Sequence, residues 1–314
     1  INVFLKNKIL YVFVFCVSLS YHTHKKYKTL DMGCGDGTTS FLLTGGEIDK
    51  KFDVYLGTKF KNSNLVPRMD RSSSGSLRDT KGDIYDHYSK LYEKYCRPKK
   101  LKNKFTYGMD WKSSLLRKAE LLNFYEKLVL KDCNKLPLNF KDNSLDMVFS
   151  TIVYWLNDPK KIFPEINRIL KKGGYFIFTA PKEDIPKLTV KSFLNKLKFK
   201  FTDRLDRGRH ANWKRHAKKD SYWKNQIKKN NLQLVKIKKL HPKLQIILGE
   251  SIIRTLITAF GVLYEDLLPK NQKTFFKFKG QYVKELYEIL KPFADDKYYN
   301  KLDMAYNVYI VKKK

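Results

Sequence analysis

The feature that most constrains this chain is a glycine-rich turn, DMGCGDG at 31–37, which directly follows a short apolar stretch with the character of a β-strand. Glycine has no Cβ, so such a turn can bend sharply and let its backbone approach a ligand. A helix is predicted to begin directly after it, with free N–H groups that suit a carboxylate or a phosphate. A dinucleotide-binding turn would need a third glycine where Thr38 stands, so that kind of site is disfavoured.

Strands and helices alternate along most of the chain after this turn. Hydrophobic patterns predict strands at 105–111, 128–132, 145–151 and 175–181, with helices at 113–128 and 159–170. This alternation is typical of a parallel sheet with helices on both faces. A further helix and strand are expected at 221–231 and 232–240, and the alternating segment 305–311 is expected to close an edge of the sheet.

Composition favours a folded domain but leaves the meaning of the charge open. The chain has 314 residues, of which 42% are hydrophobic, and a formal net charge of +33. That apolar fraction is ample for a core. A charge of this size is typical of proteins that bind nucleic acid or an anionic membrane face. Lysine outnumbers arginine 53 to 11 along the whole chain, and the compositional bias of an AT-rich genome explains such an excess equally well.

The cysteines and the N-terminal segment bear on the cellular compartment. The four cysteines form no CxxC pair and no zinc-ligand spacing, which predicts no metal site and favours a reduced, cytoplasmic setting. The apolar run 9–19 resembles a signal or anchor segment, but it is shorter than the roughly 20 residues that span a bilayer. A buried element packed near the core is the preferred interpretation of this part of residues 1–25.

Several segments, in the right order, resemble the class I S-adenosylmethionine-dependent methyltransferases, in particular the type 11 small-molecule group. LDMGCGDG at 30–37 is similar to the first motif of that family, and YGMDW at 107–111 places Asp110 at the end of a second strand. The runs 131–151 and 165–181 follow the family's later strands. The resemblance implies a Rossmann-like α/β fold, with a seven-stranded sheet in the order 3-2-1-4-5-7-6, helices on both faces and two insertions.

The resemblance also implies a cofactor, S-adenosylmethionine, and a role for each residue around it. Gly33, Gly35 and Gly37 would hold the methionine part, with Asp31 near its ammonium group. Asp110 would accept hydrogen bonds from both ribose hydroxyls, since a carboxylate offers two acceptor oxygens.

The remaining implied roles concern the adenine ring and the methyl group. Met109 or Trp111 would pack on the adenine face, and Asp132 would lie near its amino group. Cys133 would supply a backbone N–H, and Ser150 with Thr151 would line the methyl-donor pocket. All these residues are expected at the carboxyl ends of strands, where open α/β sheets bind ligands.

One spacing departs from the family pattern. Asp110 follows Gly37 by 73 residues, whereas about 20 is usual for this step in nucleotide-binding α/β folds. Asp53 has the more ordinary spacing, but it begins an apolar run, whereas Asp110 ends one. Asp110 is therefore the preferred ribose ligand, and 45–104 is interpreted as an insertion that forms a candidate lid.

The implied domain plan follows from that insertion and from a second one. Residues 26–240 together with 301–314 would form the methyltransferase domain, and 1–25 stays unassigned. The largely helical segment 241–300 would be an insertion that caps the substrate or lies against a membrane surface to admit a lipid-linked substrate. Simple core packing of this segment is the alternative.

The sequence predicts the methyl acceptor less specifically than it predicts the cofactor. The place where adenine-methylating enzymes carry (N/D)PP(Y/F) reads STIVYW at 150–155, so a nucleic-acid substrate is disfavoured. The basic segment 204–215 contains Arg204, Arg207, Arg209 and Arg215, and arginine suits bidentate contact with phosphate or carboxylate. His210, His216 and Tyr154 are the candidate catalytic residues, against the alternative of a solvated basic loop and a packed aromatic pair.

The sequence therefore predicts methyl transfer from S-adenosylmethionine to a small-molecule acceptor or a sugar- or lipid-linked one that carries negative charge. An RNA methyltransferase and a non-catalytic binding protein on the same fold are the alternatives. Salt-sensitive RNA binding would support the first, and failure to bind the cofactor would support the second.

Overall fold

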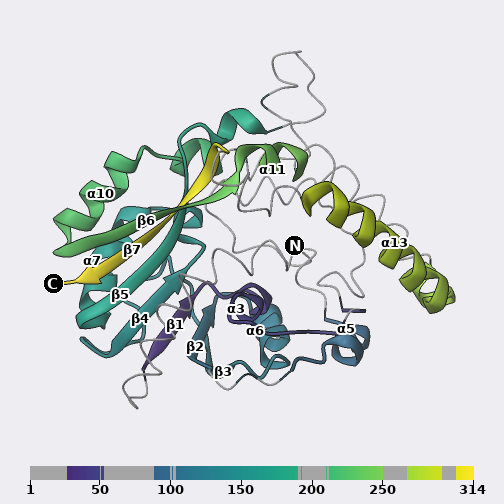
Figure 1. The fold of residues 1–314 in the computed structure, drawn as a ribbon. Helices are drawn as coiled ribbons and strands as arrows, with labels where there is room; N and C mark the ends of the chain where they lie inside the picture. Colours follow the sequence, from purple (N-terminus) through teal and green to yellow (C-terminus); the bar gives the residue numbers. More distant parts are fainter. Residues whose placement is uncertain are drawn as a thin grey trace.

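The computed structural model of this protein describes residues 27–49, 51–52, 88–99, 101, 104–189, 192, 210, 212–249, 267–291 and 302–314 (Figure 1). The apolar run 9–19, Asp53, and the arginines at 204, 207 and 209 lie outside these residues. So do residues 53–87 of the 45–104 insertion.

A seven-stranded sheet forms the centre of the fold. Its strands are β1 (Thr29–Met32), β2 (Phe105–Asp110), β3 (Tyr125–Leu130), β4 (Leu145–Ser150), β5 (Leu170–Pro181), β6 (Leu232–Pro242) and β7 (Met304–Lys313). They are ordered β3-β2-β1-β4-β5-β7-β6, as predicted. β7 runs antiparallel to both of its neighbours, and every other pairing in the sheet is parallel.

Helices cover both faces of this sheet. The helices among the described residues are α3 (Thr38–Leu43), α5 (Lys90–Tyr95), α6 (Ser113–Glu120), α7 (Ile162–Ile169), α10 (Asp220–Lys229), α11 (Lys243–Leu248) and α13 (Gln272–Leu290), with short 3-10 turns η3 (Val153–Trp155), η4 (Pro159–Lys161) and η5 (Ile185–Leu188). Phe41 of α3 and Leu116 of α6 belong to one buried hydrophobic cluster. Phe163 of α7 and Trp223 of α10 belong to another. The α/β fold class predicted from the alternation is confirmed.

Two details of the predicted elements are wrong. The helix expected over 113–128 ends at Glu120, because Asn123 turns the chain with a φ of 47° and β3 begins at Tyr125. The segment expected to close the sheet edge, 305–311, lies inside the sheet between β5 and β6. It is buried along its whole length, so its alternation did not mark one solvated face.

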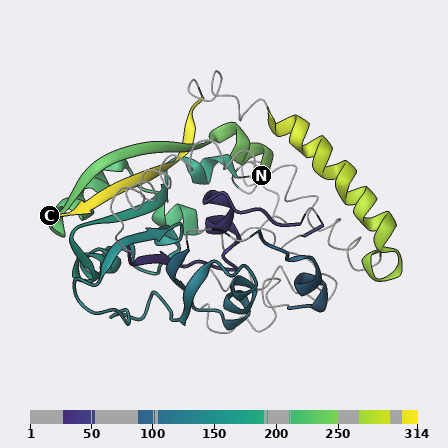
Figure 2. The ribbon, with the colours of Figure 1, turned by 60° about the horizontal axis from the view of Figure 1, so that its bottom comes forward.

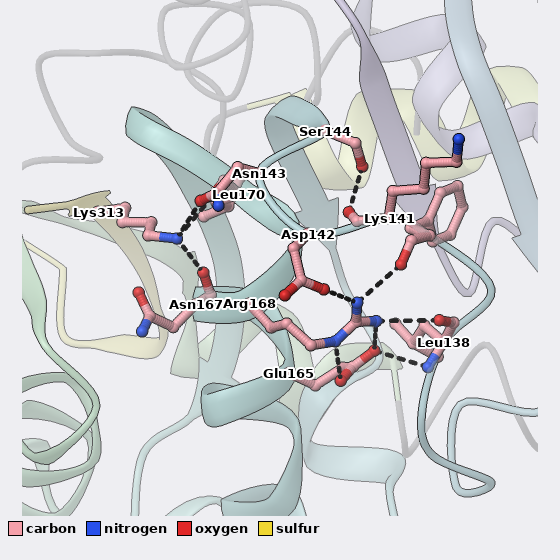
Figure 3. A network of polar contacts seen from close by, with 11 residues as sticks. Leu138, Lys141, Asp142, Asn143, Ser144, Glu165, Asn167, Arg168, Leu170 and Lys313 are labelled. Atoms are coloured by element: carbon pink, nitrogen blue, oxygen red, sulfur yellow. Dashed lines mark hydrogen bonds and ion pairs between the residues drawn. The ribbon is translucent and has the colours of Figure 1, made fainter.

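The loop between β3 and β4 is held on α7 by a charged network (Figure 3). Arg168 donates to the carbonyls of Leu138 and Phe140 at 3.1 and 2.8 Å and to the Glu165 carboxylate at 2.6 Å. Glu165 also accepts from the Leu138 amide at 2.6 Å. Because one guanidinium satisfies several loop carbonyls at once, the loop that follows the third strand keeps a fixed path.

The first insertion leaves and rejoins the domain at one place. Glu47 and Lys99 form an ion pair, and the Lys99 amide donates to the Glu47 carbonyl at 2.9 Å. α5 then contacts the start of α13: the Tyr95 hydroxyl donates to Gln272 at 2.9 Å, and its ring meets that of Phe276 at 5.0 Å. In both views α13 lies on the opposite side of the molecule from the C-terminus (Figures 1 and 2).

No helix among the described residues combines the length and the apolar character that crossing a membrane requires.

Candidate functional site

The glycine turn is fastened to the end of the neighbouring strand. The amides of Gly33 and Cys34 both donate to the Met109 carbonyl, at 2.8 and 2.9 Å. Because β1 and β2 are parallel neighbours, the turn and Asp110 meet at the carboxyl edge of the sheet. The insertion of 45–104 lengthens the chain between them without separating them in space.

The Asp110 side chain accepts a hydrogen bond from the backbone of the glycine turn. Its Oδ2 accepts from the Gly35 amide at 3.0 Å, and its Oδ1 accepts from the Lys112 amide at 3.0 Å. Burial raises the pKa of this carboxyl, while hydrogen bonds from the Lys112 and Gly35 amides act in the opposite direction. Each carboxylate oxygen keeps a further lone pair. The geometry therefore leaves Asp110 able to accept from two more donors.

Asp31 lies beneath the turn, at the end of β1. It is 2% exposed, and its Oδ2 accepts from the Tyr125 hydroxyl at 2.7 Å. Burial raises the pKa of Asp31 to about 6, opposed by hydrogen bonds from Ser40 and Tyr125. Removing an acid from water disfavours its charged form, so a cationic group placed beside Asp31 would favour its ionisation.

Glycine is needed at the different positions of this turn for different structural reasons. Gly33, Gly35 and Gly37 all have φ between 59° and 76°, which side chains other than glycine's rarely adopt. A Cβ on Gly33 would lie 2.3 Å from the Ile152 side chain, whereas a Cβ on Gly35 would meet nothing within 4 Å. Gly33 thus serves packing, and Gly35 borders open space beside Asp110, where a ligand can approach the backbone.

The two residues that flank Asp110 lie in different surroundings. The Met109 side chain is fully buried in the hydrophobic core, so it cannot pack on an adenine ring as one alternative proposed. Trp111 is half-buried, with Lys112 Nζ 5.1 Å from its ring centroid. Of the two residues, Trp111 alone offers an aromatic face next to Asp110.

Asp132 and Cys133 follow the end of β3 at the same edge. Asp132 Oδ1 accepts from the Asn134 amide at 2.9 Å and so caps the loop. Cys133 is buried, and burial together with nearby Asp110 and Asp132 raises the pKa of its thiol. An unreactive thiol fits a residue that offers its backbone, because nucleophilic cysteines need a lowered pKa.

Ser150 and Thr151, at the end of β4, differ in how far their side chains are exposed. Ser150 is fully buried; its hydroxyl donates to the Met32 carbonyl at 2.9 Å and accepts from the Ile152 amide at 3.2 Å. This hydroxyl joins β4 to β1 and holds Ile152 against the turn. Thr151 is half-buried, so it is the better placed of the two to line a pocket.

The end of the first insertion packs against the glycine turn. Tyr92 of α5 is fully buried, its ring contacts Phe52 at 4.9 Å, and its hydroxyl lies 3.5 Å from Asp36 Oδ2. Asp36 stands between Gly35 and Gly37 in the turn. α5 therefore supports the turn from the side, which the sequence pattern did not predict.

The candidate catalytic residues are not brought together as a catalytic group. Tyr154 is half-buried, and its ring lies 5.9 Å from that of Tyr306. His210 Nδ1 lies 2.9 Å from Thr189 Oγ1. His216 is buried on the helical turn that also contains Trp213. The described contacts join none of these three side chains to one another.

Sequence reasoning missed two groups near the site. Tyr125, which holds Asp31, lay in a segment taken for helix. His241, at the carboxyl end of β6, has a φ of 56° and places Nδ1 3.4 Å from Gln245 Oε1 and its ring 5.7 Å from Tyr306. Neither residue belongs to a recognisable spacing pattern, so only the folded chain could reveal them.

Comparison with known families supports the arrangement at this edge. A family model described as a methyltransferase domain matches residues 90–178. The matched range contains Asp110, the loop after β3 and β4 with its following turn. This match agrees with the resemblance of residues 90–178 to the class I S-adenosylmethionine-dependent methyltransferases. S-adenosylmethionine is the methyl donor of that family and hence the cofactor against which the site is to be tested.

Two curated relatives carry the same name in different organisms. The malonyl-[acyl-carrier protein] O-methyltransferase of Nitrosospira multiformis is 28% identical over 133 residues, which are 42% of this chain and 38% of the relative. A homologous protein of Coxiella burnetii is 30% identical over 87 residues, or 27% and 28% of the two chains. This chain thus spans well under half of the length of the curated relatives it matches.

Solved structures match this chain at low sequence identity. The YcgJ protein of Bacillus subtilis is 12% identical, with a TM-score of 0.42 over 98% of each chain. At that level no argument rests on it, and the fold assignment rests on the strand order of the chain itself.

The residues at this edge fit S-adenosylmethionine. Gly35 borders open space, so a ligand can touch the backbone there. Asp110 has acceptor capacity for a diol and Asp31 is a buried acid suited to an ammonium group. Both acids and the turn lie along one stretch of the carboxyl edge, where a molecule with a ribose at one end and an amino acid at the other would extend.

Proposed function

We propose that this protein transfers the methyl group of S-adenosylmethionine to a small or carrier-linked acceptor that bears negative charge. The observation that carries the proposal is the fastening of the glycine turn to Asp110 through the 3.0 Å bond from the Gly35 amide. That bond joins the two elements that a nucleoside-containing cofactor needs, an approachable backbone and a diol acceptor, at one edge of the sheet.

The roles of the chain's residues follow from their positions. Asp110 accepts from the two ribose hydroxyls, Asp31 pairs with the ammonium group, and Trp111 packs on the adenine ring. The backbone of Cys133 and the Asp132 side chain flank the adenine edge. The bound cofactor supplies a methyl group on a positively charged sulfur, and the protein contributes chiefly by holding the acceptor in line with it.

The acceptor side favours an anion over a neutral amine or hydroxyl. The names of the two relatives specify a malonyl group on a carrier protein, and the free carboxylate of such a group is already ionised. An ionised acceptor needs no general base, which agrees with candidate catalytic residues that do not form a group. Tyr154 and His210 then shape the acceptor side instead of moving a proton.

The insertions are proposed to enclose the site. α5 touches Asp36 of the glycine turn through Tyr92, and α13 packs on α5 through Gln272 and Phe276. Residues 45–104 and 241–300 are thus joined to each other beside the turn. We propose that they act together as the lid and the cap of the methyltransferase domain, 26–240 with 301–314.

Calorimetry with S-adenosylmethionine tests the cofactor part of this proposal. Binding to the wild type and its loss in Asp110→Ala are expected, whereas binding of nicotinamide dinucleotides instead would overturn the assignment. Formation of S-adenosylhomocysteine on addition of a malonyl thioester tests the acceptor part. A short RNA serves as the competing acceptor, and methylation of the RNA alone would replace the small acceptor by nucleic acid.

A further inference from the structure

Two polar side chains on one helical turn are buried with an unpaired atom. Asn212 and His216 are four residues apart, so they lie on the same face of the helical turn. They are 7% and 6% exposed, and within the described part of the chain neither Asn212 Oδ1 nor His216 Nε2 has a hydrogen-bond partner. A buried polar group that lacks a hydrogen-bond partner destabilises the folded state. Two of them side by side therefore indicate a polar ligand.

The charges around this pair are mainly positive. Burial, followed by the nearby Arg215 and Lys218 cations, lowers the pKa of His216 to about 4, and Asp158 acts in the opposite direction. Arg215 and Lys218 belong to the same segment as His216, and Asp158 precedes η4. Among the described residues, these are the charged groups that act on the pKa of the imidazole. Two cations against one acid favour an anionic ligand over a cationic one.

The pair lies on the acceptor side of the domain. Trp213, between Asn212 and His216, is 1% exposed and packs in the same hydrophobic cluster as Tyr154 and Tyr306. Tyr154 follows the carboxyl end of β4, and Tyr306 is paired with Pro181 at the carboxyl end of β5. The helical turn is thereby joined to the edge of the sheet that holds the cofactor residues.

We propose that Asn212, His216, Arg215 and Lys218 form a binding site for one oxyanion, a carboxylate or a phosphate monoester. The imidazole N–H donates to the anion, and Asn212 Oδ1, which can only accept, takes a hydrogen bond from a water molecule bound beside the anion. The two cations supply the charge. That the anion is part of the methyl acceptor rests on the proposed function, whereas the anion site itself does not.

NMR titrations that follow the imidazole signals of the histidines, with malonate and with inorganic phosphate, test the site in the absence of cofactor. The imidazole signal of His216, assigned by its disappearance in His216→Gln, is expected to shift on titration with one of the two anions. Its apparent pKa is expected to rise by one unit or more, because a bound anion favours the protonated ring; one unit corresponds to about tenfold tighter binding of that form. Malonate alone identifies a carboxylate site, and phosphate alone identifies a phosphate site.

A signal that stays unmoved up to the solubility limit of both salts would show that water alone fills the site and would overturn the proposal. His241 is the internal control, because it is a half-buried histidine whose pKa is also lowered by desolvation, but it belongs to β6. Equal shifts of both histidine signals would indicate a general salt effect and would also overturn it.

Matched lysine variants separate a specific site from diffuse positive charge. Lys218→Ala is expected to weaken anion binding about fivefold, as for a partly exposed charge pair. Lys214→Ala removes an exposed lysine of the same segment that is not among the groups facing His216, and binding is expected to stay unchanged. Equal losses in the two variants would refute the site, and neither substitution alters a buried residue.

Failure of this site and failure of the proposed function give different results. Asp110→Ala is expected to lose S-adenosylmethionine binding and to keep the His216 titration. Malonyl thioester methylation that persists in Asn212→Leu with an unmoved His216 signal would leave the function standing and remove the site. A titrating His216 in a protein that binds no S-adenosylmethionine would do the reverse.

Discussion

The cofactor side and the acceptor side of this domain differ in how their polar groups are used. On the cofactor side, Asp31, Asp110 and Ser150 are all buried and each is engaged by hydrogen bonds within the chain. On the acceptor side, Asn212 and His216 are equally buried, but each keeps an atom without a partner among the described residues. These three cofactor-side groups are paired within the chain, whereas the acceptor pair is proposed to find its partners in a ligand.

The two regions also differ in the sign of their charges. Acids gather at the ends of β1 and β2, whereas Arg215 and Lys218 flank the acceptor pair. A net charge of +33 therefore conceals a local division, with acids where a cationic cofactor is expected and cations where an anion is expected. Variants on the cofactor side test this contrast.

Asp110→Ala should have the largest effect. Removing the carboxylate deletes two charge-assisted bonds to the ribose and leaves the Gly35 amide unpaired, and each such bond contributes about 1.5–3 kcal/mol. We expect affinity for S-adenosylmethionine, measured by calorimetry, to fall by about 100-fold or more. Asp132→Ala is the comparison and should cost less, because that side chain only flanks the adenine edge and one of its oxygens already caps the loop. Unchanged affinity in Asp110→Ala would return the ribose role to Asp53.

Gly33→Ala and Gly35→Ala should damage different properties. An added Cβ on Gly33 clashes with Ile152 at 2.3 Å, and the loss of stability should be about 3 kcal/mol from overpacking and a positive φ. Gly35→Ala meets no protein atom and should cost only about 1 kcal/mol, but its Cβ enters the ligand space. Denaturant unfolding and cofactor titration should rank the two variants in opposite orders.

Asp31 should make cofactor binding depend on pH. Its pKa of about 6 means that half of the acid is neutral at that pH, and pairing with an ammonium group requires the ionised form. Affinity should therefore be full well above pH 6 and weaken as pH falls through it, by about tenfold between pH 7 and pH 5. Asp31→Asn should bind weakly with no such dependence over the same range. A wild-type profile that is flat there would remove Asp31 from the ammonium site.

Ser150→Ala should have the smallest effect on ligand binding. The buried hydroxyl holds the Met32 carbonyl and the Ile152 amide, so its loss should cost about 1–3 kcal/mol of stability. Affinity for S-adenosylmethionine should change by no more than about threefold, since the hydroxyl is used within the fold. A larger loss of affinity in Ser150→Ala than in Thr151→Ala would show that Ser150 faces the ligand after all.

Much of the cofactor side could be predicted because its signals are local. A glycine turn after a strand and an acid at the end of the next strand are each readable from a few residues, and both lie where they were expected. The role of Ser150 and the burial of Met109 could not be read in this way. Whether a residue at a strand end faces the ligand or the core depends on the pleat and on the neighbouring helix.

The surroundings of the acceptor-side histidines could not be predicted, for a related reason. His210 and His216 are six residues apart and look alike in sequence, yet one contacts Thr189 and the other is buried beside an unpaired asparagine. Burial and partners come from segments far away in the chain, such as Asp158. The helix predicted over 113–128 fails similarly, because Asn123 turns the chain between two apolar runs that suit a helix as well as a strand.

The sequence by itself determined the fold class of this protein: alternating elements dictate a largely parallel sheet, and the glycine turn with Asp110 predicts where a nucleoside-containing cofactor would bind. Only the tertiary structure decided which of the predicted site residues are buried in the core and which stay accessible, how Tyr125 and burial set the pKa of Asp31, and that Asn212 and His216 each have a buried unpaired atom on one helical turn. Patterns of type and spacing are local properties of a chain, whereas burial, pairing and charge at a point are produced by segments that meet only on folding.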